Sequence, residues 1–197
     1  MLTEVVRALR PTAVLLVLLA AITGLAFPAL ITGIAQLTMP VQANGSLIRD
    51  GNTVVGSELI AQGFAGPRYF HPRPSAAGKG YDATASAATN LAPGSKDLRD
   101  AIAARVSDAR SQGMTGVAVP PDLVTTSASG LDPDLSPEAA FSQTARIAKA
   151  RGMSEAAVRS LIEANIANPV LGIIGERRVN VLLLNRQLDR KAPNTEG

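Results

Sequence analysis

The chain has 197 residues, enough for one ordinary domain with an added segment, and its 19 Lys and Arg residues against 16 Asp and Glu residues give a formal net charge of +3. The basic residues are scattered and only 3% of the residues are aromatic, which argues against a nucleic-acid-binding surface. The absence of cysteine excludes disulfides, cysteine-ligated metals and thiol catalysis.

A long apolar segment lies near the N-terminus. Residues 12–39 contain no charged side chain, and about 20 apolar residues in a helix already span the hydrocarbon core of a bilayer. A secretory signal peptide is the alternative, but its apolar region would be only about 7 to 15 residues long and a small-residue cleavage site would follow it. We therefore predict a single transmembrane helix over residues 12–39.

The charges on either side of this segment predict its orientation. Arg7 and Arg10 precede it with one acidic residue, whereas no charge follows it until Arg49. Because basic residues favour the cytoplasmic side, we expect residues 1–11 in the cytoplasm and residues 40–197 outside it, in the periplasm if the cell has one. The chain is then a single-pass protein of the inner (cytoplasmic) membrane.

Small residues and a proline interrupt the apolar segment. Such residues allow close approach between helices in a bilayer or introduce a bend. We therefore expect a partner helix to pack against this segment at Ala20, Gly24 and Pro28, with Ala35 further along.

The sequence after the apolar segment predicts first a hairpin and then a long loop. Residues 46–56 indicate two short strands around Asp50 and Gly51, a pair suited to a tight turn, and a short helix is predicted to begin near Ser57. Residues 63–94 are rich in Gly, Pro, Ser and Ala and show no periodicity. A loop of this length in a compact domain is usually functional or part of an interface.

Helices and strands are then mixed without a regular alternation. We predict helices that begin at Ser95, Ser136 and Ser154, each with a side chain suited to cap a helix N-terminus, and the second of these is expected to run to about Arg151. Strands are predicted at 116–121, ending at two prolines, and at 177–185, where the sequence is apolar enough to be buried. The pattern indicates an α+β domain over residues 40–197.

The stretch 124–140 contains the residue types of an active-site loop. Ser127 and Ser129 are candidate nucleophiles, but a serine needs a base, and the only histidine, His71, is not tied to either serine by anything in the sequence. We interpret His71 as a loop residue that holds a backbone carbonyl. Pairing of a serine with Lys79, Lys96 or Lys149 would lack the S-x-x-K motif, which the chain does not contain.

Metal and phosphate sites are also absent from the sequence pattern. The spacing of Asp132, Asp134, Ser136 and Glu138 resembles the start of a calcium loop, but proline and glutamine stand at the sixth and twelfth positions, where such a loop needs Gly and Glu. No phosphate-binding glycine motif is present. We therefore predict no catalytic, cofactor-binding or metal site, and we interpret Ser129 and Asp132 as turn-forming residues.

Five sequence motifs occur in a fixed order after a basic N-terminus and one predicted membrane helix, and together they indicate a family. The chain resembles the KdpC family, the C subunit of the Kdp high-affinity potassium-transporting ATPase, over nearly its whole length, in the phrases RPSAAGKGYD, NLAPGSKDL, VPPDLVTTSASGLDPDLSPEAA, QTARIAKARG and RRVNVLLLN. Family members more usually have Gly, His and Pro where this chain has Ala128, Asp134 and Arg177.

The resemblance implies a non-catalytic accessory subunit, needed for assembly and stability. It implies that the chain assembles with a channel-like potassium-binding subunit and a P-type ATPase subunit, which handle potassium and ATP, in a complex that imports potassium. It also implies a catalytic chaperone that raises the affinity of the ATPase subunit for ATP. Because the charge pattern places the domain away from cytoplasmic ATP, we favour coupling through subunit contacts, with the domain covering the entrance of the channel-like subunit.

The resemblance also selects residues expected to shape the fold and its interface. These residues match family motifs: Arg73, Pro74, Ser75, Asp122, Leu123, Thr125, Ser127, Ser129, Gly130, Asp132, Pro133, Gln143 and Arg146. Gln143 and Arg146 lie three positions apart on a predicted helix, so they share a face and are expected to make one polar contact together. The alternative function is a membrane-tethered extracytoplasmic hydrolase or ligand-binding module that uses the 63–94 loop with Ser127 or Ser129.

Overall fold

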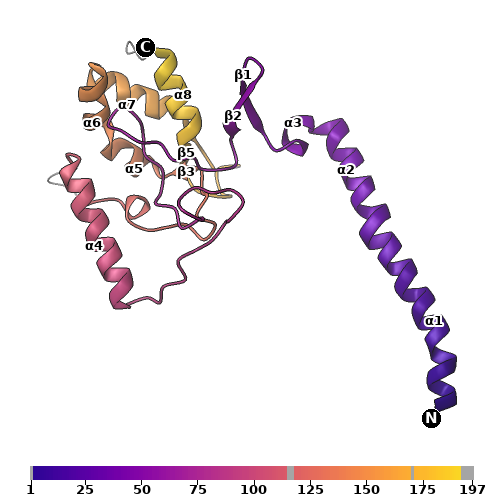
Figure 1. The fold of residues 1–197 in the computed structure, drawn as a ribbon. Coiled ribbons are helices and arrows are strands. Elements are labelled where there is room, and N and C mark those ends of the chain that lie inside the picture. The colour runs from indigo at the N-terminus through magenta and orange to yellow at the C-terminus, as the bar shows by residue number, and fades with distance from the viewer. Residues whose placement is uncertain (1, 115–117, 170, 192–197) are drawn as a thin grey trace. The chain divides into compact units, whose positions relative to one another are not determined.

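The structure is a computed structural model that describes residues 2–114, 118–169 and 171–191. The chain divides into two compact units, Met1–Leu47 and Ile48–Gly197, which are described separately (Figure 1). The first is helical, and the described residues of the second form helices and two small antiparallel sheets. This arrangement confirms the predicted α+β class behind one N-terminal apolar helix.

The N-terminal unit is dominated by one long apolar helix. It consists of α1 (Leu2–Ala21), a π-helical turn (Ile22–Ala26) and α2 (Phe27–Thr38), and the short α3 (Pro40–Ala43) follows. The 36 residues from Thr3 to Thr38 are long enough and apolar enough to cross a membrane. The helix begins at Leu2, before the predicted apolar segment of residues 12–39, because the charged residues near the N-terminus continue the same helix.

The π-helical turn has a local cause. Pro28 has no N–H to donate to the carbonyl one turn earlier, and its ring would crowd that carbonyl in a regular α-helix. The wider turn over Ile22–Ala26 immediately precedes this proline, and Phe27 N–H donates to the Ile22 carbonyl across it. The predicted irregularity near Gly24 and Pro28 is therefore a widened turn in a continuous helix.

The second unit begins with the predicted hairpin and the predicted long loop. Strands β1 (Leu47–Asp50) and β2 (Thr53–Ser57) pair with each other, and Gly51 in the turn between them has a φ of +57°. The helix predicted from Ser57 is wrong, because the Ser57 hydroxyl accepts the Leu59 N–H at 3.2 Å and makes a turn. Residues 63–94 contain no helix or strand, as predicted.

Helix α4 and the chain after it agree only partly with the prediction. Helix α4 (Lys96–Ser111) is capped by the Ser95 side chain, which accepts the Leu98 N–H. The strand predicted at 116–121 falls partly on residues 115–117, outside the described residues, and residues 118–120 form no strand. Two consecutive prolines remove ladder donors there, and a 3₁₀ turn (Pro121–Leu123) follows.

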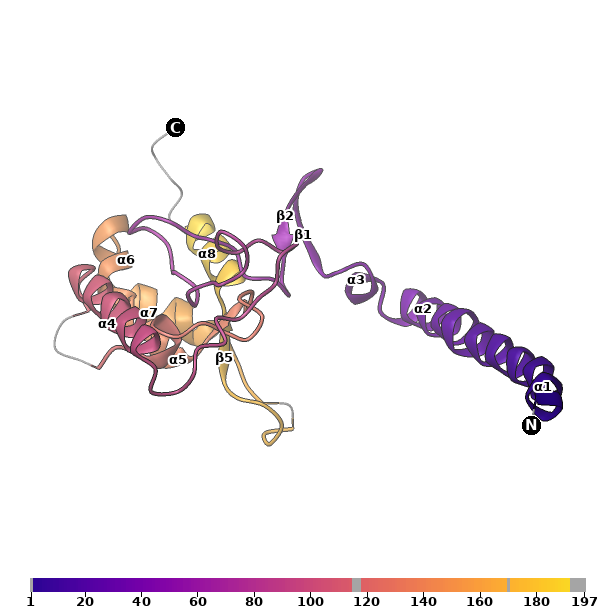
Figure 2. The ribbon, with the colours of Figure 1, turned by 60° about the horizontal axis from the view of Figure 1, so that its bottom comes forward.

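The helix predicted over residues 136–151 is divided in two. Helix α5 (Pro137–Ser142), capped by Ser136, and helix α6 (Thr144–Arg151) meet at Gln143, whose side chain contacts the loop rather than continuing the helix surface. Helix α7 (Glu155–Ala164) follows and is capped by Ser154 as predicted. Figure 2 shows these helices close together with α4 and α8.

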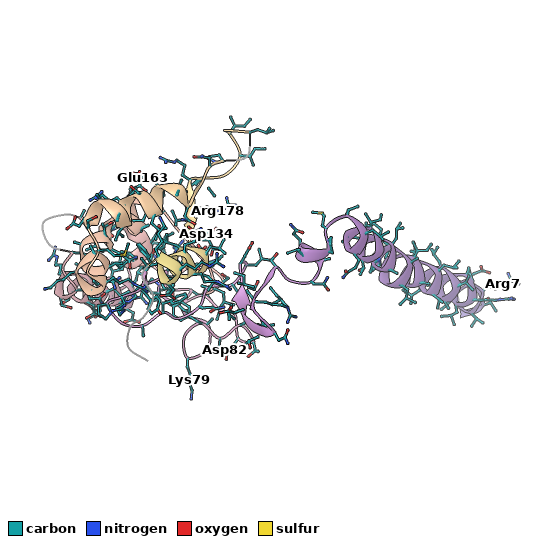
Figure 3. The ribbon with its side chains drawn as sticks, turned by 90° about the horizontal axis from the view of Figure 1, so that it is seen from above. Arg7, Lys79, Asp82, Asp134, Glu163 and Arg178 are labelled. Atoms are coloured by element: carbon teal, nitrogen blue, oxygen red, sulfur yellow. The ribbon has the colours of Figure 1, made fainter. Side chains whose placement is uncertain are left out.

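A three-stranded antiparallel sheet joins distant parts of the domain. Strand β5 (Arg178–Asn180) lies between β3 (Asp134–Leu135) and β4 (Ile166–Ala167), and Val179 is paired with both Leu135 and Ile166. Residues 171–177, which precede β5, project away from the helices (Figures 2 and 3).

The strand predicted at 177–185 is wrong after residue 180. Helix α8 (Val181–Lys191) begins there, and the Asn180 side chain accepts the Leu183 N–H near its start. Buried Leu184 and Leu188 lie one turn apart, a helical spacing that a short apolar run does not reveal. Together they belong to the core formed by Phe70, Leu135, Ala139, Ala140, Ile147, Ala148, Val158, Leu161, Ile162, Val179, Val181, Leu184 and Leu188.

Candidate functional site

The side chains of the family motifs meet along the loop of residues 63–94, beginning with two amides. Gln143 Oε1 accepts the His71 N–H at 2.8 Å and its Nε2 donates to the His71 carbonyl at 3.0 Å. Asn185 makes the same pair of bonds with Phe70, the residue before His71. Its Oδ1 accepts the Phe70 N–H at 2.8 Å, and its Nδ2 donates to the Phe70 carbonyl at 2.9 Å. Both amides are fully buried. They supply hydrogen-bond partners for the backbone N–H and carbonyl groups of residues 70 and 71, which lie outside the strands.

Arg146 holds the same loop one turn further along α6. Its Nη1 donates to the carbonyls of Gly66, Pro67 and Tyr69 at 3.3, 2.8 and 2.9 Å, and its Nη2 donates to Gln143 Oε1 at 2.6 Å. The predicted contact between Gln143 and Arg146 is therefore present, and it is internal to the domain. Burial lowers the pKa of Arg146 to about 10, so the guanidinium stays charged at neutral pH.

A second arginine anchors the loop from the end of α6. Arg151 Nε donates to the Arg68 carbonyl at 2.7 Å, and Nη2 pairs with Asp189 Oδ1 at 2.7 Å. Its guanidinium also lies 4.9 Å from the ring centre of Tyr69, whose hydroxyl donates to Asp189. The buried Arg151 guanidinium thus connects three segments: the end of α6, the loop of residues 63–94 and helix α8.

The second half of the loop is held by the 122–133 stretch. Arg73 Nη1 pairs with Asp132 Oδ2 at 3.1 Å, and Nη2 donates to the Thr125 hydroxyl at 3.3 Å and to the Thr126 carbonyl at 3.5 Å. Pro74, which follows Arg73, is half-buried in the same loop. Arg73 thus joins the loop to residues more than fifty positions later in the chain.

Ser75 and Gly130 bring two backbones into close approach. The Ser75 hydroxyl donates to the Gly130 carbonyl at 2.6 Å and accepts the N–H groups of Ala77 at 3.1 Å and Tyr81 at 2.8 Å. Gly130 has a φ of +67°, and a Cβ there would lie 2.7 Å from the Ala77 nitrogen and 2.7 Å from the Ala87 carbonyl oxygen. Only glycine fits this position without a shift of the neighbouring backbone.

The two candidate serine nucleophiles lie in a turn. Ser129 Oγ accepts the Leu131 N–H at 3.0 Å and lies 3.4 Å from Ser127 Oγ. Asp132 Oδ1 accepts the Asp134 N–H at 3.1 Å. The interpretation of Ser129 and Asp132 as turn-forming residues is confirmed.

The remaining motif residues also serve the domain's own backbone. Asp122 Oδ2 accepts the Ser136 N–H at 2.8 Å at the start of α5, and the Pro133 carbonyl accepts the Val181 N–H at 3.0 Å at the start of α8. Leu123 packs against the core. These contacts position helix ends, where backbone groups otherwise lack partners.

His71 does not form a catalytic pair with either serine. Its Nε2 donates to the Gly66 carbonyl at 2.8 Å, which confirms the prediction of a loop histidine that holds a carbonyl. Burial, and secondarily the charge of Arg146, lower the pKa of His71, so the ring is neutral near pH 7. Within residues 2–114, 118–169 and 171–191, no hydrogen bond joins His71 to Ser127 or Ser129.

Comparison with known proteins identifies the family. The sequence model described as "KdpC: K+-transporting ATPase, c chain" matches residues 9–190. The chain belongs to the KdpC family. This confirms the resemblance and makes the chain a membrane-associated accessory subunit of a potassium-transporting ATPase complex. The residues that the structure describes contain one candidate membrane helix.

Relatives in the KdpC family match almost the whole chain. The potassium-transporting ATPase KdpC subunit of Caulobacter vibrioides (strain NA1000 / CB15N) is 52% identical over 186 residues, which are 94% of each chain. The corresponding subunit of Rhodospirillum rubrum is 51% identical over 189 residues, covering 95% of this chain and 97% of the relative. That of Bradyrhizobium diazoefficiens is 50% identical over 198 residues, covering 94% and 98%.

The KdpC-family domain also contains a cleft of about 760 Å³ beside the end of α4. Gln112, Ala145, Arg146, Lys149 and Ala150 are among its lining residues. The nucleophile candidates do not line it, and the Arg146 guanidinium donates to backbone carbonyls instead. Among the residues that the structure describes, no group of three His, Asp or Glu side chains is placed to hold a metal.

Three residues of this loop attachment were not predicted from the sequence of this KdpC-family chain. Asn185 ends a run of leucines, Arg151 ends α6, and Asp189 lies in the last turns of α8. The signal for Asn185 is a polar residue at the end of an apolar run. It predicts a buried amide only when residues 181–191 are known to form a helix.

Proposed function

We propose that this chain completes and stabilises an ATP-driven potassium import complex from outside the cytoplasm. Its apolar helix packs in the membrane against the channel-like potassium-binding subunit and the P-type ATPase subunit, with Ala20, Gly24 and Pro28 at the contact. Its domain covers the entrance of the channel-like subunit. The proposed boundaries are 1–11 for the cytoplasmic segment, 12–39 for the membrane segment and 40–197 for the domain.

The observation that carries the proposal is how the motif side chains are used. Gln143, Arg146, Arg73 and Ser75 all hydrogen-bond to the domain's own loop, and they do not converge on a free nucleophile or base. These four side chains hold the loop of residues 63–94 in a fixed shape. An accessory subunit that binds its partners through this domain requires such a fixed surface. A tethered hydrolase, the alternative function, would need a base beside Ser127 or Ser129, and His71 is engaged elsewhere.

Any effect of the chain on ATP affinity would be indirect. The charges around the apolar segment favour a domain on the side away from cytoplasmic ATP, and we propose this orientation. Arg146, a side chain suited to phosphate, already donates to three carbonyls and one amide oxygen. We therefore propose that the chain acts as a chaperone of the ATPase subunit through contacts alone. Titration of the purified full chain with a fluorescent ATP analogue should show no saturable binding, and saturable binding would contradict this part of the proposal.

Cysteine labelling tests the orientation, since the natural chain has no cysteine. Lys79 is exposed in the loop of the domain (Figure 3), and Thr3 lies at the start of the helix. In intact cells with a permeabilised outer membrane, a membrane-impermeant maleimide should label Lys79→Cys and should label Thr3→Cys only after lysis. The reverse pattern would overturn the proposed topology.

A further inference from the structure

The chain folds back on itself directly after the apolar helix. Helix α2 ends at Thr38, and Met39 has a φ of −141° and a ψ of 55°, because the proline that follows it disfavours helical backbone. Pro40 then begins the one-turn helix α3, and the chain bends between α2 and α3 (Figure 1). The Ser46 N–H donates to the Val41 carbonyl at 2.9 Å and closes the turn after α3.

Two amide side chains join this turn to the last part of α2. Asn44 Nδ2 donates to Gln36 Oε1 at 3.1 Å, and Gln36 Nε2 donates to Asn44 Oδ1 at 3.4 Å. Asn44 Nδ2 also donates to the Pro40 carbonyl at 2.7 Å. The Thr38 hydroxyl donates to the Ile34 carbonyl at 2.8 Å. These polar side chains have partners within the same unit, although they are exposed, and this is the condition that lipid surroundings impose on polar groups.

The apolar side chains around the bend are exposed. Leu37, Met39 and Val41 are 87%, 51% and 61% exposed in this chain. They follow directly on the apolar side chains of α2, and no charged residue occurs between Arg10 and Arg49. The apolar surface of the helix therefore continues past Thr38 into α3. Because the surface is continuous with the candidate membrane helix, the bilayer is the partner that fits it.

The length of the helix leaves open which of its residues lie in the hydrocarbon. The 36 residues from Thr3 to Thr38 would be about 54 Å long at about 1.5 Å per residue, whereas the hydrocarbon core is about 30 Å thick. Part of the helix must therefore stand outside the hydrocarbon, or the helix must tilt. Residues that anchor a helix at the membrane interface decide between these arrangements.

We propose that residues 39–44 form an interfacial anchor, in which α3 lies at the boundary between phospholipid headgroups and acyl chains. Leu37, Met39 and Val41 contact the acyl chains, and tilt rather than a stalk in water accommodates the excess length of the helix. The anchor contains no Lys or Arg, so the contact does not require anionic lipid. This inference rests on the proposed function, because it requires the helix to cross the membrane, and it adds a lipid-binding segment beyond the helix.

Tryptophan fluorescence tests the depth of α3, since the natural chain has no tryptophan. The full chain with Val41→Trp is reconstituted in phosphatidylcholine vesicles with brominated acyl chains, and in unbrominated vesicles with iodide on both sides of the membrane. Val41→Trp should be quenched by the brominated lipid, most strongly when the bromine lies near the headgroup end of the acyl chain. This quenching should not change when part of the lipid is anionic phosphatidylglycerol.

Two control variants mark the hydrocarbon and the water. Leu25→Trp, in the apolar helix, should be quenched by lipid brominated deep in the acyl chain, and Lys79→Trp, in the exposed loop of the domain, should be quenched by iodide alone. If Leu25→Trp is quenched by lipid while Val41→Trp behaves like Lys79→Trp, the anchor is overturned and the proposed function stands. If brominated lipid does not quench Leu25→Trp either, the membrane-spanning helix and the proposed function are overturned with it.

Photocrosslinking distinguishes lipid from protein in the assembled complex. The photoreactive amino acid benzoylphenylalanine is placed at position 41 of the full chain, and membranes that contain the whole complex are irradiated. Mass spectrometry of this chain should show mainly phospholipid adducts. Adducts formed mainly with another protein would overturn the proposal.

Discussion

Gln143 and His71 are joined by two hydrogen bonds in which a side-chain amide takes the place of a neighbouring strand. The Gln143 amide accepts from the His71 N–H at 2.8 Å and donates to the His71 carbonyl at 3.0 Å. Asn185 makes the equivalent pair of bonds with Phe70, the residue before. The loop of residues 63–94 is therefore attached to helices by buried amides, which explains how a long segment without helix or strand keeps a fixed course.

Replacement of Gln143 should destabilise the domain markedly. Gln143→Ala leaves the N–H and carbonyl of His71 without partners, and each unsatisfied buried group costs about 1–3 kcal/mol. We expect a loss of at least about 2 kcal/mol in the free energy of unfolding, or roughly 4–8 °C in Tm, for the full chain in mild detergent. The control is Gln112→Ala at the exposed end of α4, with a change within about 0.5 kcal/mol. Equal shifts in the two variants would contradict the account.

Gly130 and Gly152 have the same left-handed backbone conformation, so alanine substitutions at the two positions separate the cost of that conformation from the cost of a steric clash. Gly130 and Gly152 have φ values of +67° and +65°, but only Gly130 faces atoms closer than 3 Å from a Cβ. Gly152→Ala should cost about 1 kcal/mol, the cost of a left-handed alanine. Gly130→Ala should cost about 3 kcal/mol or more, because the backbone of residues 76, 77 and 87 must also move. Comparable urea midpoints for the two variants would show that the close approach is unimportant.

The single histidine should make stability fall in mild acid. Burial lowers the pKa of His71 below its ordinary value of 6.5 in the folded chain, so the unfolded chain binds the proton more readily. The free energy of unfolding should therefore decrease as the pH falls below 6.5, and this contribution should level off below the folded-state pKa. In His71→Gln, which keeps a donor for the Gly66 carbonyl, the histidine contribution should disappear.

NMR titration of the imidazole gives an independent check, since no other histidine contributes. A folded-state pKa at or above 6.5 would contradict the predicted direction.

Packing of the apolar helix against a partner should depend on which face is changed. Gly24 shares one face with Ala20 and Pro28, whereas Gly33 lies nine residues further on, roughly two and a half turns of α-helix. Gly24→Leu should reduce recovery of the other subunits with the tagged chain, because a large side chain prevents close approach. Gly33→Leu should leave recovery unchanged. A larger loss with Gly33→Leu would place the contact on another face.

Local rules predicted the starts of three helices correctly, whereas the helix predicted from Ser57 is a turn and the type of the element after residue 180 was wrong. The side chains of Ser95, Ser136 and Ser154 all accept an N–H in the first turn of the predicted helix, because capping depends only on neighbouring residues. Whether residues 181–185 form a strand or a helix depends on the core that they meet, and the apolar run fits both. The break at Gln143 likewise depends on His71, a residue distant in the chain.

The same limit applies to the candidate site. The turns at Ser129 and Asp132 and the contact between Gln143 and Arg146 are local and were predicted. Asn185 and Arg151 reach residues more than eighty positions away, so no spacing in the sequence indicates their role. Leu171 is 85% exposed, and its apolar character in the sequence does not indicate this exposure, which depends on the fold around it.

The central claim, that this chain is an accessory subunit of a potassium-importing ATPase, is tested most directly by purification of the complex. The chain, tagged at its C-terminus, is purified in mild detergent from membranes of potassium-starved cells, and the eluate is assayed for potassium-stimulated ATP hydrolysis. The account predicts that larger subunits accompany the chain and that this activity is present. A chain that elutes alone and without activity would contradict it.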